Sequence, residues 1–371
     1  MTESGERAGA ERVEFGVVNY NGGDAVLGCV RSILEQAGPP CRVWLFDNGS
    51  SDGSVEAVEG AFAGDGVRVI RSARNLGYAG ALNRLLERMD APVVVLSNMD
   101  VEFDAGFAEA VAAALAADPG AAAAASLVLE AADPPVVNSV GVRFFGDLHA
   151  QNVGSGEAYD PERVTGAREA AFGSYGAVMC FRRESVAGLW FDEDYFLFFE
   201  ETDFFLRLAL LGGRTVFAEG ALARHQRSLS TGRYSPLKLY YGERNRLTTV
   251  FKLLPVWYWP VSAIHTLRRL LVLARGPERA RGRPGRRDAA DSAAGAVQPK
   301  GAGDAGDEPP VLPSTRVIVR TLLRAWGAAL ARLPGTLRKR RAFWRGAPAT
   351  PGDALELIRS YALPSSELRL R

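Results

Sequence analysis

The sequence predicts an α/β protein with a mostly parallel central sheet flanked by helices. Three observations lead to this prediction. Short β-rich runs alternate with helical patterns from residue 13 to 128, turn residues close each run, and polar or acidic side chains follow the ends of the runs. Apolar residues make up 47% of the 371 positions and charged residues 23%, so the chain can bury one large core or two modest ones.

Four strands are predicted in this first part, at residues 13–18, 42–46, 67–70 and 93–96. Between the first two, Val26, Val30 and Ile33 recur at helical spacing behind Asp24, a suitable N-cap. Units of this kind join their strands by right-handed crossovers and bind ligands beyond the carboxyl ends of the strands. We therefore expect the functional side chains to lie at those ends.

The middle of the chain is less regular. Residues 129–170 are punctuated by glycine and proline and predict a long loop with room for a hairpin. A strand at 177–181 is followed by a helix at 202–211, which ends at Gly212. Residues 237–275, rich in Leu, Tyr and Trp, predict one or two helices.

The C-terminal part changes in composition. Residues 276–312 are rich in Arg, Gly, Pro, Ala and Asp without periodicity, which predicts a disordered linker. Residues 316–345 contain nine Arg or Lys and no acid, with apolar residues at helical spacing. This basic amphipathic segment has two interpretations: it binds an anionic membrane surface, or it docks on an acidic face of the protein. The net charge is −11 over residues 1–265 and +12 over 266–371, and we favour the membrane.

Composition also excludes some classes of protein. A uniformly basic nucleic-acid binder is excluded by the acidic first part, so no nucleic-acid partner is expected. The three cysteines form no CxxC pair, which argues against a disulfide framework and against a Cys-based zinc site. The N-terminus lacks the pattern of a signal peptide, and the longest apolar stretch, 250–264, is shorter than the roughly 20 residues of a membrane span. We expect a cytoplasmic protein that lies on a membrane without crossing it.

Polar side chains follow the first and second predicted strands. Asparagine, aspartate and serine side chains at two adjacent strand ends can hold a base and a ribose. The same residue types also make ordinary turns, and both interpretations remain open for each loop alone. The candidates are Asn19, Asn21, Asp47, Asn48 and Asp52.

A turn of small residues, Arg74 to Asn83, follows the third strand and opens a helix. Small residues such as Gly77 allow the backbone to approach a ligand closely, and a helix N-terminus favours phosphate. The pattern is neither GxGxxG nor Walker A, which disfavours NAD and P-loop nucleotide sites. Close packing alone also explains a residue such as Gly80.

Asp100 follows the buried fourth strand in the sequence Ser97-Asn98-Met99-Asp100-Val101-Glu102. A carboxylate at this sheet edge can bind Mg²⁺ or Mn²⁺ that bridges a diphosphate, and Glu102 competes for the role. A plain N-cap is the alternative. His225 stands between Arg224 and Gln226-Arg227 and suits the same metal or diphosphate. The alternative is an isolated surface histidine that binds no ligand.

The densest acidic cluster is Phe198-Phe199-Glu200-Glu201-Thr202-Asp203-Phe204. Neighbouring carboxylates in a partly dry setting repel one another, which raises their proton affinity and suits a general base. Alternatively, the cluster is an acidic first helical turn, in which Asp203 caps the helix or pairs with Arg207.

The order of these motifs resembles family 2 glycosyltransferases, especially their bacterial rhamnosyltransferase-like branch. The matching stretches are VVNYNGG, FDNGSSDGS, RNLGYAGALN, SNMDV, GAVMCFRRE, GLWFDEDYFLFFEETDFFLRLALLGG, ARHQRSLSTG and YYGERNRL. The resemblance implies a GT-A fold over residues 12–235, with a nucleotide-sugar half at 12–128 and an acceptor half at 129–235. Flanking it we expect a flexible N-terminus at 1–11, C-terminal helices at 236–275, the linker at 276–312 and the basic helical tail at 313–371.

The resemblance also implies roles for individual residues. Asp100 would be the acid of the metal motif, which here reads Asn98-Met99-Asp100, and His225 would join it on Mg²⁺ or Mn²⁺. The family's glutamate–aspartate pair, whose second member is the base, falls on Glu200 and Glu201, so the base is one methylene longer here. Trp190 and Phe191 would form an acceptor wall. The nucleotide-sugar site would comprise Asn19, Asn21, Asp47, Asn48, Asp52, Asn75, Gly77, Asn83 and Asn98.

The expected activity is an inverting, metal-assisted transfer of a sugar from a nucleotide-diphosphate donor to a hydroxyl of a lipid-linked or cell-envelope glycan. By branch resemblance the donor is dTDP-rhamnose. Two alternatives share part of the motif set: a nucleotidyltransferase that makes activated sugars, and an inactive GT-A-like protein that binds glycan or scaffolds a complex. The nucleotidyltransferase is disfavoured because no basic, Gly-rich phosphate loop follows the first strand.

Overall fold

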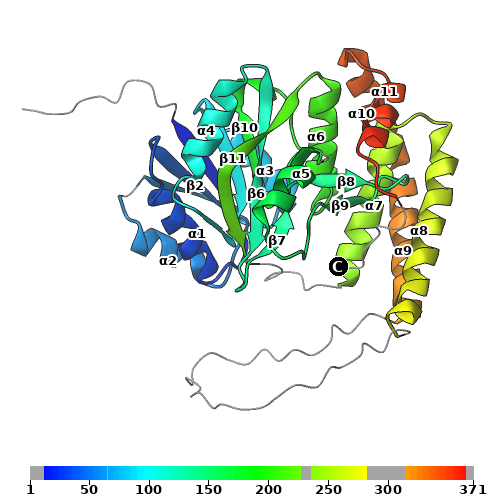
Figure 1. Ribbon diagram of the computed structural model, residues 1–371, viewed down its shortest axis with the longest axis horizontal. Coiled ribbons are helices and arrows are strands. Elements are labelled where there is room, and N and C mark those ends of the chain that lie inside the picture. Colours follow the sequence, from blue (N-terminus) through cyan, green and yellow to red (C-terminus); the bar gives the residue numbers. More distant parts are fainter. Residues whose placement is uncertain (1–11, 65, 170, 227–234, 282–313, 365–371) are drawn as a thin grey trace, which may run out of the picture.

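The computed structural model describes residues 12–64, 66–169, 171–226, 235–281 and 314–364. Figure 1 shows a twisted sheet with helices on both faces and a further layer of helices beside it, formed by the C-terminal part of the chain. The predicted flexible N-terminus, 1–11, lies outside the described residues. Within the described part of the chain, no helix combines the length and the apolarity needed to cross a bilayer.

The first part of the chain forms the predicted parallel sheet. The strands β1, β2, β3 and β4 lie in the order β3-β2-β1-β4, and every neighbouring pair is parallel. The helices α1, α2 and α3 each connect two strands that follow one another in the sequence, as in the right-handed crossovers of parallel sheets. The elements are β1 (Val13–Asn19), α1 (Ala25–Leu34), β2 (Cys41–Asp47), α2 (Ser54–Ala61), β3 (Val67–Arg71), α3 (Gly77–Leu86) and β4 (Val93–Asn98).

The sheet continues with strands of mixed direction. β10 lies antiparallel between β4 and β6, and β11 runs parallel to β6 and antiparallel to β5, the last strand of the path. Most side chains on the two faces of the sheet are apolar and buried, as expected for a sheet that helices cover on each side. The elements are β5 (Val101–Phe103), α4 (Phe107–Ala117), β6 (Ala121–Glu130), β10 (Val178–Arg182), η1 (Arg183–Val186), η2 (Glu193–Tyr195), α6 (Glu200–Leu210) and β11 (Arg214–His225).

The interval predicted as a long loop is more ordered than expected. It continues β6 to Glu130, and β7 (Val136–Ser139) pairs with β6. The predicted hairpin is present as β8 (Val142–Phe144) and β9 (Ala150–Asn152), and α5 covers Pro161–Glu169. The prediction of a loop was wrong for β7, because a strand of four residues is too short to show an alternating pattern, and for the helix α5.

Five helices follow among the described residues: α7 (Pro236–Leu253), α8 (Tyr258–Arg281), α9 (Thr315–Ala331), α10 (Leu333–Gly346) and α11 (Pro351–Ser360). The helical region expected at 237–275 consists of two helices separated at Pro255, and the second extends beyond the expected end to Arg281. The start of the predicted linker is therefore helical, and the rest of it, 282–312, lies outside the described residues.

The basic tail docks on the protein. The inward face of α9, with Leu322, Ala325 and Ala329, is buried against α7. On α10, Arg340 donates hydrogen bonds to the carbonyls of Phe251, Lys252 and Leu254 at 3.1, 3.2 and 2.7 Å. These carbonyls end α7 and have no partner inside their own helix, so Arg340 caps them. The structure therefore shows the docked arrangement for this face of the tail.

A buried group of charges lies beneath the docked tail. Lys252 Nζ is 2.8 Å from Asp192 Oδ2 and 2.7 Å from Asp203 Oδ1, and its side chain is 3% exposed. Asp203 also accepts from Arg207 Nε at 2.8 Å, so the predicted pairing of these two residues is confirmed. Lys339 pairs with Asp192 from the tail side, with its side chain 42% exposed.

We expect Lys252→Met to destabilise the protein by about 3–5 kcal/mol, because two buried carboxylates would lose their shared cation. The free energy of unfolding in urea measures this effect. Lys339→Met is the matched control, since the same change at the half-exposed lysine should cost only about 0–1 kcal/mol. Equal losses for the two variants would contradict the prediction.

Candidate active site

Asp100 and His225 meet at the edge of the sheet. β5 and β11 are antiparallel with Val101 opposite His225, so the residue before β5 comes beside the end of β11. Asp100 Oδ1 lies 3.3 Å from His225 Nε2, and the Gln226 N–H donates to the Asp100 carbonyl at 2.8 Å. Both side chains are buried. The sequence predicted the two residues as partners, and the register of the strands brings them together.

The Asp100–His225 pair fits a divalent metal ion. His225 Nδ1 lies 3.1 Å from Asn138 Oδ1. In the tautomer that carries its proton on Nδ1, this contact is a hydrogen bond and Nε2 presents a lone pair to Asp100. Asp100 Oδ1 is buried and makes no hydrogen bond. A cation between these two electron-rich atoms would satisfy both. The described residues contain no group of three or more metal-binding side chains, so further ligands would have to come from water or substrate.

Asn138 lies on β7 and is the partner that sequence reasoning missed. It is buried and orients the imidazole of His225 through the bond to Nδ1. The one available signal was a lone asparagine in the apolar run Val136-Val137-Asn138-Ser139-Val140. An asparagine in such a run is unusual for a plain strand.

The two glutamates lie in the first turn of α6. The segment before them is held in a strained conformation, with positive φ at Phe196 (63°), Phe198 (64°) and Phe199 (74°). Asn245 of α7 holds this segment: its Nδ2 donates to the carbonyls of Tyr195, Leu197 and Phe198, at 3.0, 2.9 and 2.6 Å. α6 begins two residues earlier than predicted, so the strained segment leads directly into Glu200.

The surroundings of the two glutamates differ. Burial raises the pKa of Glu200 well above its ordinary value, the charge of Glu201 raises it further, and Glu200 Oε2 has no hydrogen-bond partner. Burial also raises the pKa of Glu201, which hydrogen bonds from its own turn oppose. Glu201 is partly exposed whereas Glu200 is buried. Burial and the neighbouring charge favour the protonated form more strongly at Glu200 than at Glu201, so the two environments suit one acid and one base.

Glycine at position 176 makes room for the long arm of Glu201. A Cβ atom on Gly176 would lie 3.3 Å from both Cγ and Cδ of Glu201. That spacing is tighter than most Cβ contacts, so a larger residue at 176 would push the carboxylate aside. The length of the Glu201 side chain is accommodated here.

One short segment connects the two acidic groups. The ring of Tyr175 contacts the imidazole of His225 with centroids 5.8 Å apart, and Gly176 contacts Glu201. Tyr78 donates to the carbonyl of Gly176 at 2.9 Å. Burial, and then the charges of Glu200, Glu201 and Asp100, raises the pKa of Tyr78 well above its ordinary value. Asp100 and Glu201, a hundred positions apart, thus lie around one segment.

The polar residues after β1 and β2 brace two loops against each other. Asn19 Nδ2 donates to Ser54 Oγ at 3.0 Å, and Asp47 Oδ1 accepts from the Ser50 N–H at 3.1 Å. Asn21 and Asp52 accept from the N–H groups of Ser51 and Gly23, at 2.8 and 2.9 Å. These side chains therefore make the hydrogen bonds of turns and of contacts between loops. Asn19 Oδ1 is nevertheless buried without a partner, so this edge has an unused acceptor.

The next loop is tied to the same edge. Asn48 Nδ2 donates to Asn75 Oδ1 at 3.1 Å, and Asn48 Oδ1 accepts from the Leu76 N–H at 2.7 Å. Gly77 has φ +77°, and a Cβ there would lie 2.4 Å from the carbonyl oxygen of Phe196. That carbonyl accepts from the Tyr78 N–H at 2.5 Å. The N-terminus of α3 is therefore capped by the strained segment, where the sequence suggested a phosphate.

Asn83 and Phe191 belong to the core. Asn83 is buried and bonds both the N–H and the carbonyl of Phe191, at 2.9 and 3.0 Å. The Phe191 ring is 2% exposed and stacks on Phe204, with centroids 4.2 Å apart. Trp190 is 43% exposed and lines a groove of about 590 Å³ between α3 and α10. Neither glutamate lines this groove, so the structure does not bring the predicted acceptor wall to them.

Asn98 lies at the end of β4 beside the connecting segment. Its N–H donates to the Ala177 carbonyl at 3.1 Å, and its carbonyl accepts from Cys29 Sγ at 3.7 Å. These backbone bonds fix the turn that leads to Asp100. Glu102, the predicted competitor of Asp100, is exposed and faces α1, where a Cβ on Gly28 would lie 2.8 Å from its Oε1. Asp100, and not Glu102, therefore faces His225.

The chain is similar to glycosyltransferases of known sequence and known structure. Residues 15–141 match the family model "Glycosyl transferase family 2". In two strains of Mycobacterium tuberculosis, N-acetylglucosaminyl-diphospho-decaprenol L-rhamnosyltransferase is 28% identical over 242 residues, which covers 58% of this chain and 76% of the relative.

Two solved structures share the fold. GalNAc-T7 with UDP, GalNAc and Mn²⁺ superposes with a TM-score of 0.54 and 14% identity, over 67% of this chain and 49% of that one. The chain therefore spans about half the length of that protein. TarS residues 1–349 from S. aureus superpose with a TM-score of 0.51 and 14% identity, over 94% and 91% of the two chains. At these identities the likeness shows the fold alone, which is the α/β fold predicted from the sequence.

Proposed function

Because the chain belongs to glycosyltransferase family 2 and has its GT-A fold, we propose that it transfers rhamnose from dTDP-rhamnose to a hydroxyl of a lipid-linked or cell-envelope glycan, with inversion. The relatives from Mycobacterium tuberculosis support rhamnose as the transferred sugar and support this acceptor class, since their name describes rhamnosyl transfer to N-acetylglucosaminyl-diphospho-decaprenol. The observation that carries the proposal is the convergence of Asp100–His225 and Glu200–Glu201 on the segment Tyr175–Gly176.

In the proposed reaction Glu201 removes the proton of the acceptor hydroxyl as that oxygen attacks the anomeric carbon. The bond to the nucleotide diphosphate breaks on the opposite face, so one displacement inverts the configuration and no enzyme-linked sugar forms. Glu200 stays protonated beside Glu201 and so does not compete for the proton. Asn245 holds the segment that aims both side chains.

A divalent ion, Mg²⁺ or Mn²⁺, would supply charge for the departing diphosphate when bound. Asp100 Oδ1 and His225 Nε2 are the atoms that would hold it, since they lie 3.3 Å apart and Asp100 Oδ1 makes no hydrogen bond. Asn138 would support this role by accepting the proton of Nδ1, which leaves Nε2 free for the ion. GalNAc-T7, which shares the fold, was solved with Mn²⁺.

The donor's nucleotide is proposed to bind at the carboxyl ends of β1, β2 and β4. The unpaired oxygen of Asn19 and the buried carboxylate of Asp47 are the candidate contacts to base and ribose. Gly77 and Asn83 instead support the segment from Phe191 to Phe199. The other proposed residues along this edge are Asn21, Asn48, Asp52, Asn75 and Asn98.

Release of nucleotide diphosphate tests the proposal. The acceptor for this test is N-acetylglucosamine linked through a diphosphate to a polyprenol such as decaprenol. With Mn²⁺ and this acceptor, we expect the protein to release dTDP from dTDP-rhamnose faster than it releases UDP from UDP-glucose or UDP-galactofuranose. The same panel without acceptor is the control for plain hydrolysis. Transfer from a UDP-sugar at a higher kcat/KM would contradict the proposed donor, and no release from any donor would contradict catalysis.

A further inference from the structure

The helix α8 is amphipathic, but its polar face is buried and its apolar face is exposed. Its inward face carries Ser262, Thr266 and Arg269, which are 1, 2 and 7% exposed. Its outward face is apolar: Ile264 is 54% exposed, Leu267 58% and Leu271 46%, and the stripe continues into the preceding turn through Val256 (58%) and Trp257 (62%). In a surface helix of a globular protein the apolar stripe normally faces the core.

Buried ion pairs fix the rotation of α8. Arg269 Nε lies 2.7 Å from Asp147 Oδ2, and the guanidinium also pairs with Glu243 of α7. Arg246 pairs with the same Glu243 at 2.8 Å, so two arginines and two acids share one dry cluster. Rotating the helix to hide Ile264 and Leu267 would break this cluster and leave buried charges unpaired. The apolar stripe is therefore held outward.

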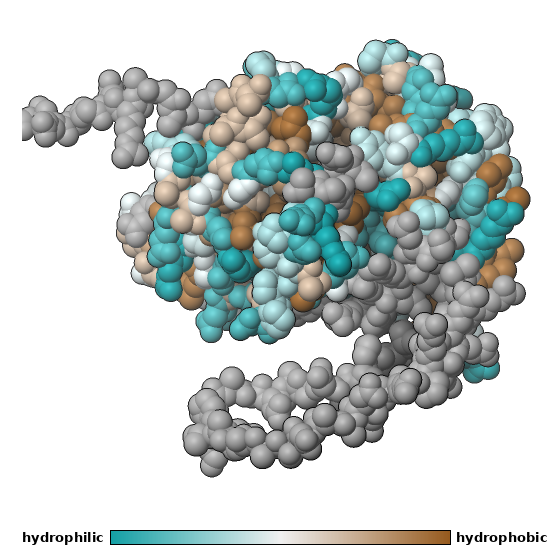
Figure 2. Space-filling view, in the orientation of Figure 1, coloured by the Kyte–Doolittle hydropathy of each residue, from teal (hydrophilic) through white to brown (hydrophobic). Residues whose placement is uncertain are grey.

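The stripe lies at the outer edge of the molecule. Figure 1 places α8 there, farthest from the sheet, and Figure 2 shows brown side chains along the same right-hand edge. Residues 256–271 span about 22 Å along a helix of ~1.5 Å rise per residue. Several large apolar side chains in one row exceed what isolated exposed residues explain, and they mark an interaction surface.

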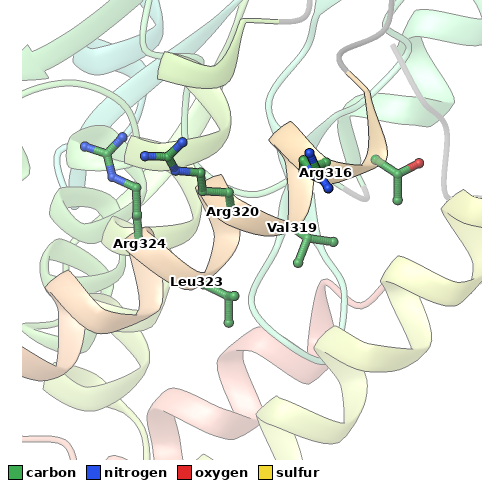
Figure 3. A pocket seen from close by; sticks show the side chains of 6 residues that line it. Arg316, Val319, Arg320, Leu323 and Arg324 are labelled. Atoms are coloured by element: carbon green, nitrogen blue, oxygen red, sulfur yellow. The ribbon is translucent and has the colours of Figure 1, made fainter.

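The segment that bears the stripe and the helices α9 and α10 carry basic residues and no acidic ones. Residues 256–271 and 314–346 contain no acidic residue, and Arg268 stands beside the stripe, exposed. On α9 a shallow hollow of about 580 Å³ is lined by apolar and arginine side chains. Figure 3 shows Arg320 and Arg324 on one side of α9 and Val319 and Leu323 on the other. Apolar side chains next to unopposed arginines match the acyl chains and anionic headgroups of a bilayer.

We propose that the outward stripe of α8, from Val256 to Leu271, lies in the interfacial layer of an anionic membrane, with Trp257 as the anchor at one end. This rests on the proposed function to the extent that a lipid-linked acceptor brings the enzyme to a membrane. It also relocates the contact expected from the sequence, because the inward faces of α9 and α10 are occupied by docking on α7. A second copy fits the stripe less well, since a two-fold contact would bring Arg268 near its own copy without an acid to balance it.

Flotation with lipid vesicles tests this inference. We expect the full chain to float with phosphatidylglycerol-containing vesicles and less with phosphatidylcholine alone, and 1 M salt should weaken the binding. The double variant Ile264→Glu with Leu267→Glu should bind about tenfold or more weakly. Leu211→Glu is the matched control, because Leu211 is 43% exposed at the end of α6 and should bind like the wild type.

Three outcomes would overturn the inference: no flotation of the wild type, unchanged flotation of the double variant, or equal loss in the Leu211→Glu control. Light scattering adds a fourth, since a wild-type dimer that the double variant converts to monomer would assign the stripe to a second copy. A water-soluble acceptor separates this test from the proposed function. The double variant should transfer sugar to that acceptor at the wild-type rate, so loss of flotation with retained transfer identifies the membrane surface alone.

Discussion

Replacing Glu201 by Gln is expected to lower kcat by about 10²–10⁴-fold, the usual contribution of a general base. The amide keeps the shape of the side chain against Gly176 but cannot take the proton of the acceptor. Binding of the donor should be unchanged, because Glu201 does not touch the residues proposed to hold it. Steady-state kinetics with dTDP-rhamnose measure kcat, and calorimetric titration with dTDP measures donor binding.

Two neighbouring changes serve as controls for this prediction. Glu201→Asp keeps the charge but withdraws it by one methylene, and a loss of about 10- to 100-fold is expected because the space beside Gly176 fits the longer arm. Glu200→Gln keeps the neutral form that burial already favours, so a smaller loss than that of Glu201→Gln is expected. If Glu200→Gln proves the more damaging variant, the assignment of the base is wrong.

The pH dependence has a definite sign. Glu201 acts as a base only when ionised, and burial raises its pKa above the ordinary 4.5, so kcat/KM should fall on acidification with a midpoint above 4.5. Glu200 also binds its proton more tightly in the folded chain than in the unfolded one. Stability therefore decreases as the pH rises from 4.5 toward the folded pKa of Glu200. The Glu200→Gln variant should lose the part of this decrease that Glu200 contributes, so its stability should fall less over this pH range, which thermal unfolding at several pH values measures.

Much of the nucleotide half could be predicted from the sequence because its signals are local. Apolar runs bounded by turns gave β1 to β4 to within one or two residues at each end, and the parallel order follows from the crossovers. The strand β7 was not foreseen, and the hairpin of β8 and β9 was expected without bounds, because each of these strands has only three or four residues. Short elements of this kind depend on tertiary contacts more than on pattern.

The candidate site likewise has residues that the sequence predicts and supporting residues that it does not. Asp100, His225, Glu200 and Glu201 were identified from residue type and position, and the register of β5 against β11 explains why the first two meet. Their supporting residues were not foreseen. Asn138 and Asn245 act through single amide groups whose partners lie 87 and about 50 positions away, and no periodicity reports such contacts. Phe191 was expected at the acceptor, but a ring that stacks on Phe204 is part of the core.

The second large effect is expected at Asp100. Asp100→Asn should lower kcat/KM by about 100-fold or more with Mn²⁺ present, because the charge that would hold the ion next to His225 Nε2 is lost. Binding of Mn²⁺ with dTDP, followed by the relaxation of water protons, should weaken in parallel. This second measurement does not depend on catalysis, so it separates loss of the ion from loss of a fold contact.

Glu102→Gln is the matched control for Asp100→Asn. It removes a carboxylate two residues away whose side chain faces α1, so Mn²⁺ binding and transfer should both stay at the wild-type level. Asn138→Leu probes the same site from the other side: without the bond to Nδ1 the imidazole is free to place its proton on Nε2, and Mn²⁺ binding should weaken although neither proposed ligand has changed. If Asp100→Asn leaves Mn²⁺ binding intact while Glu102→Gln abolishes it, the pairing of Asp100 with His225 is structural and the metal lies on the other face of the β4–β5 turn.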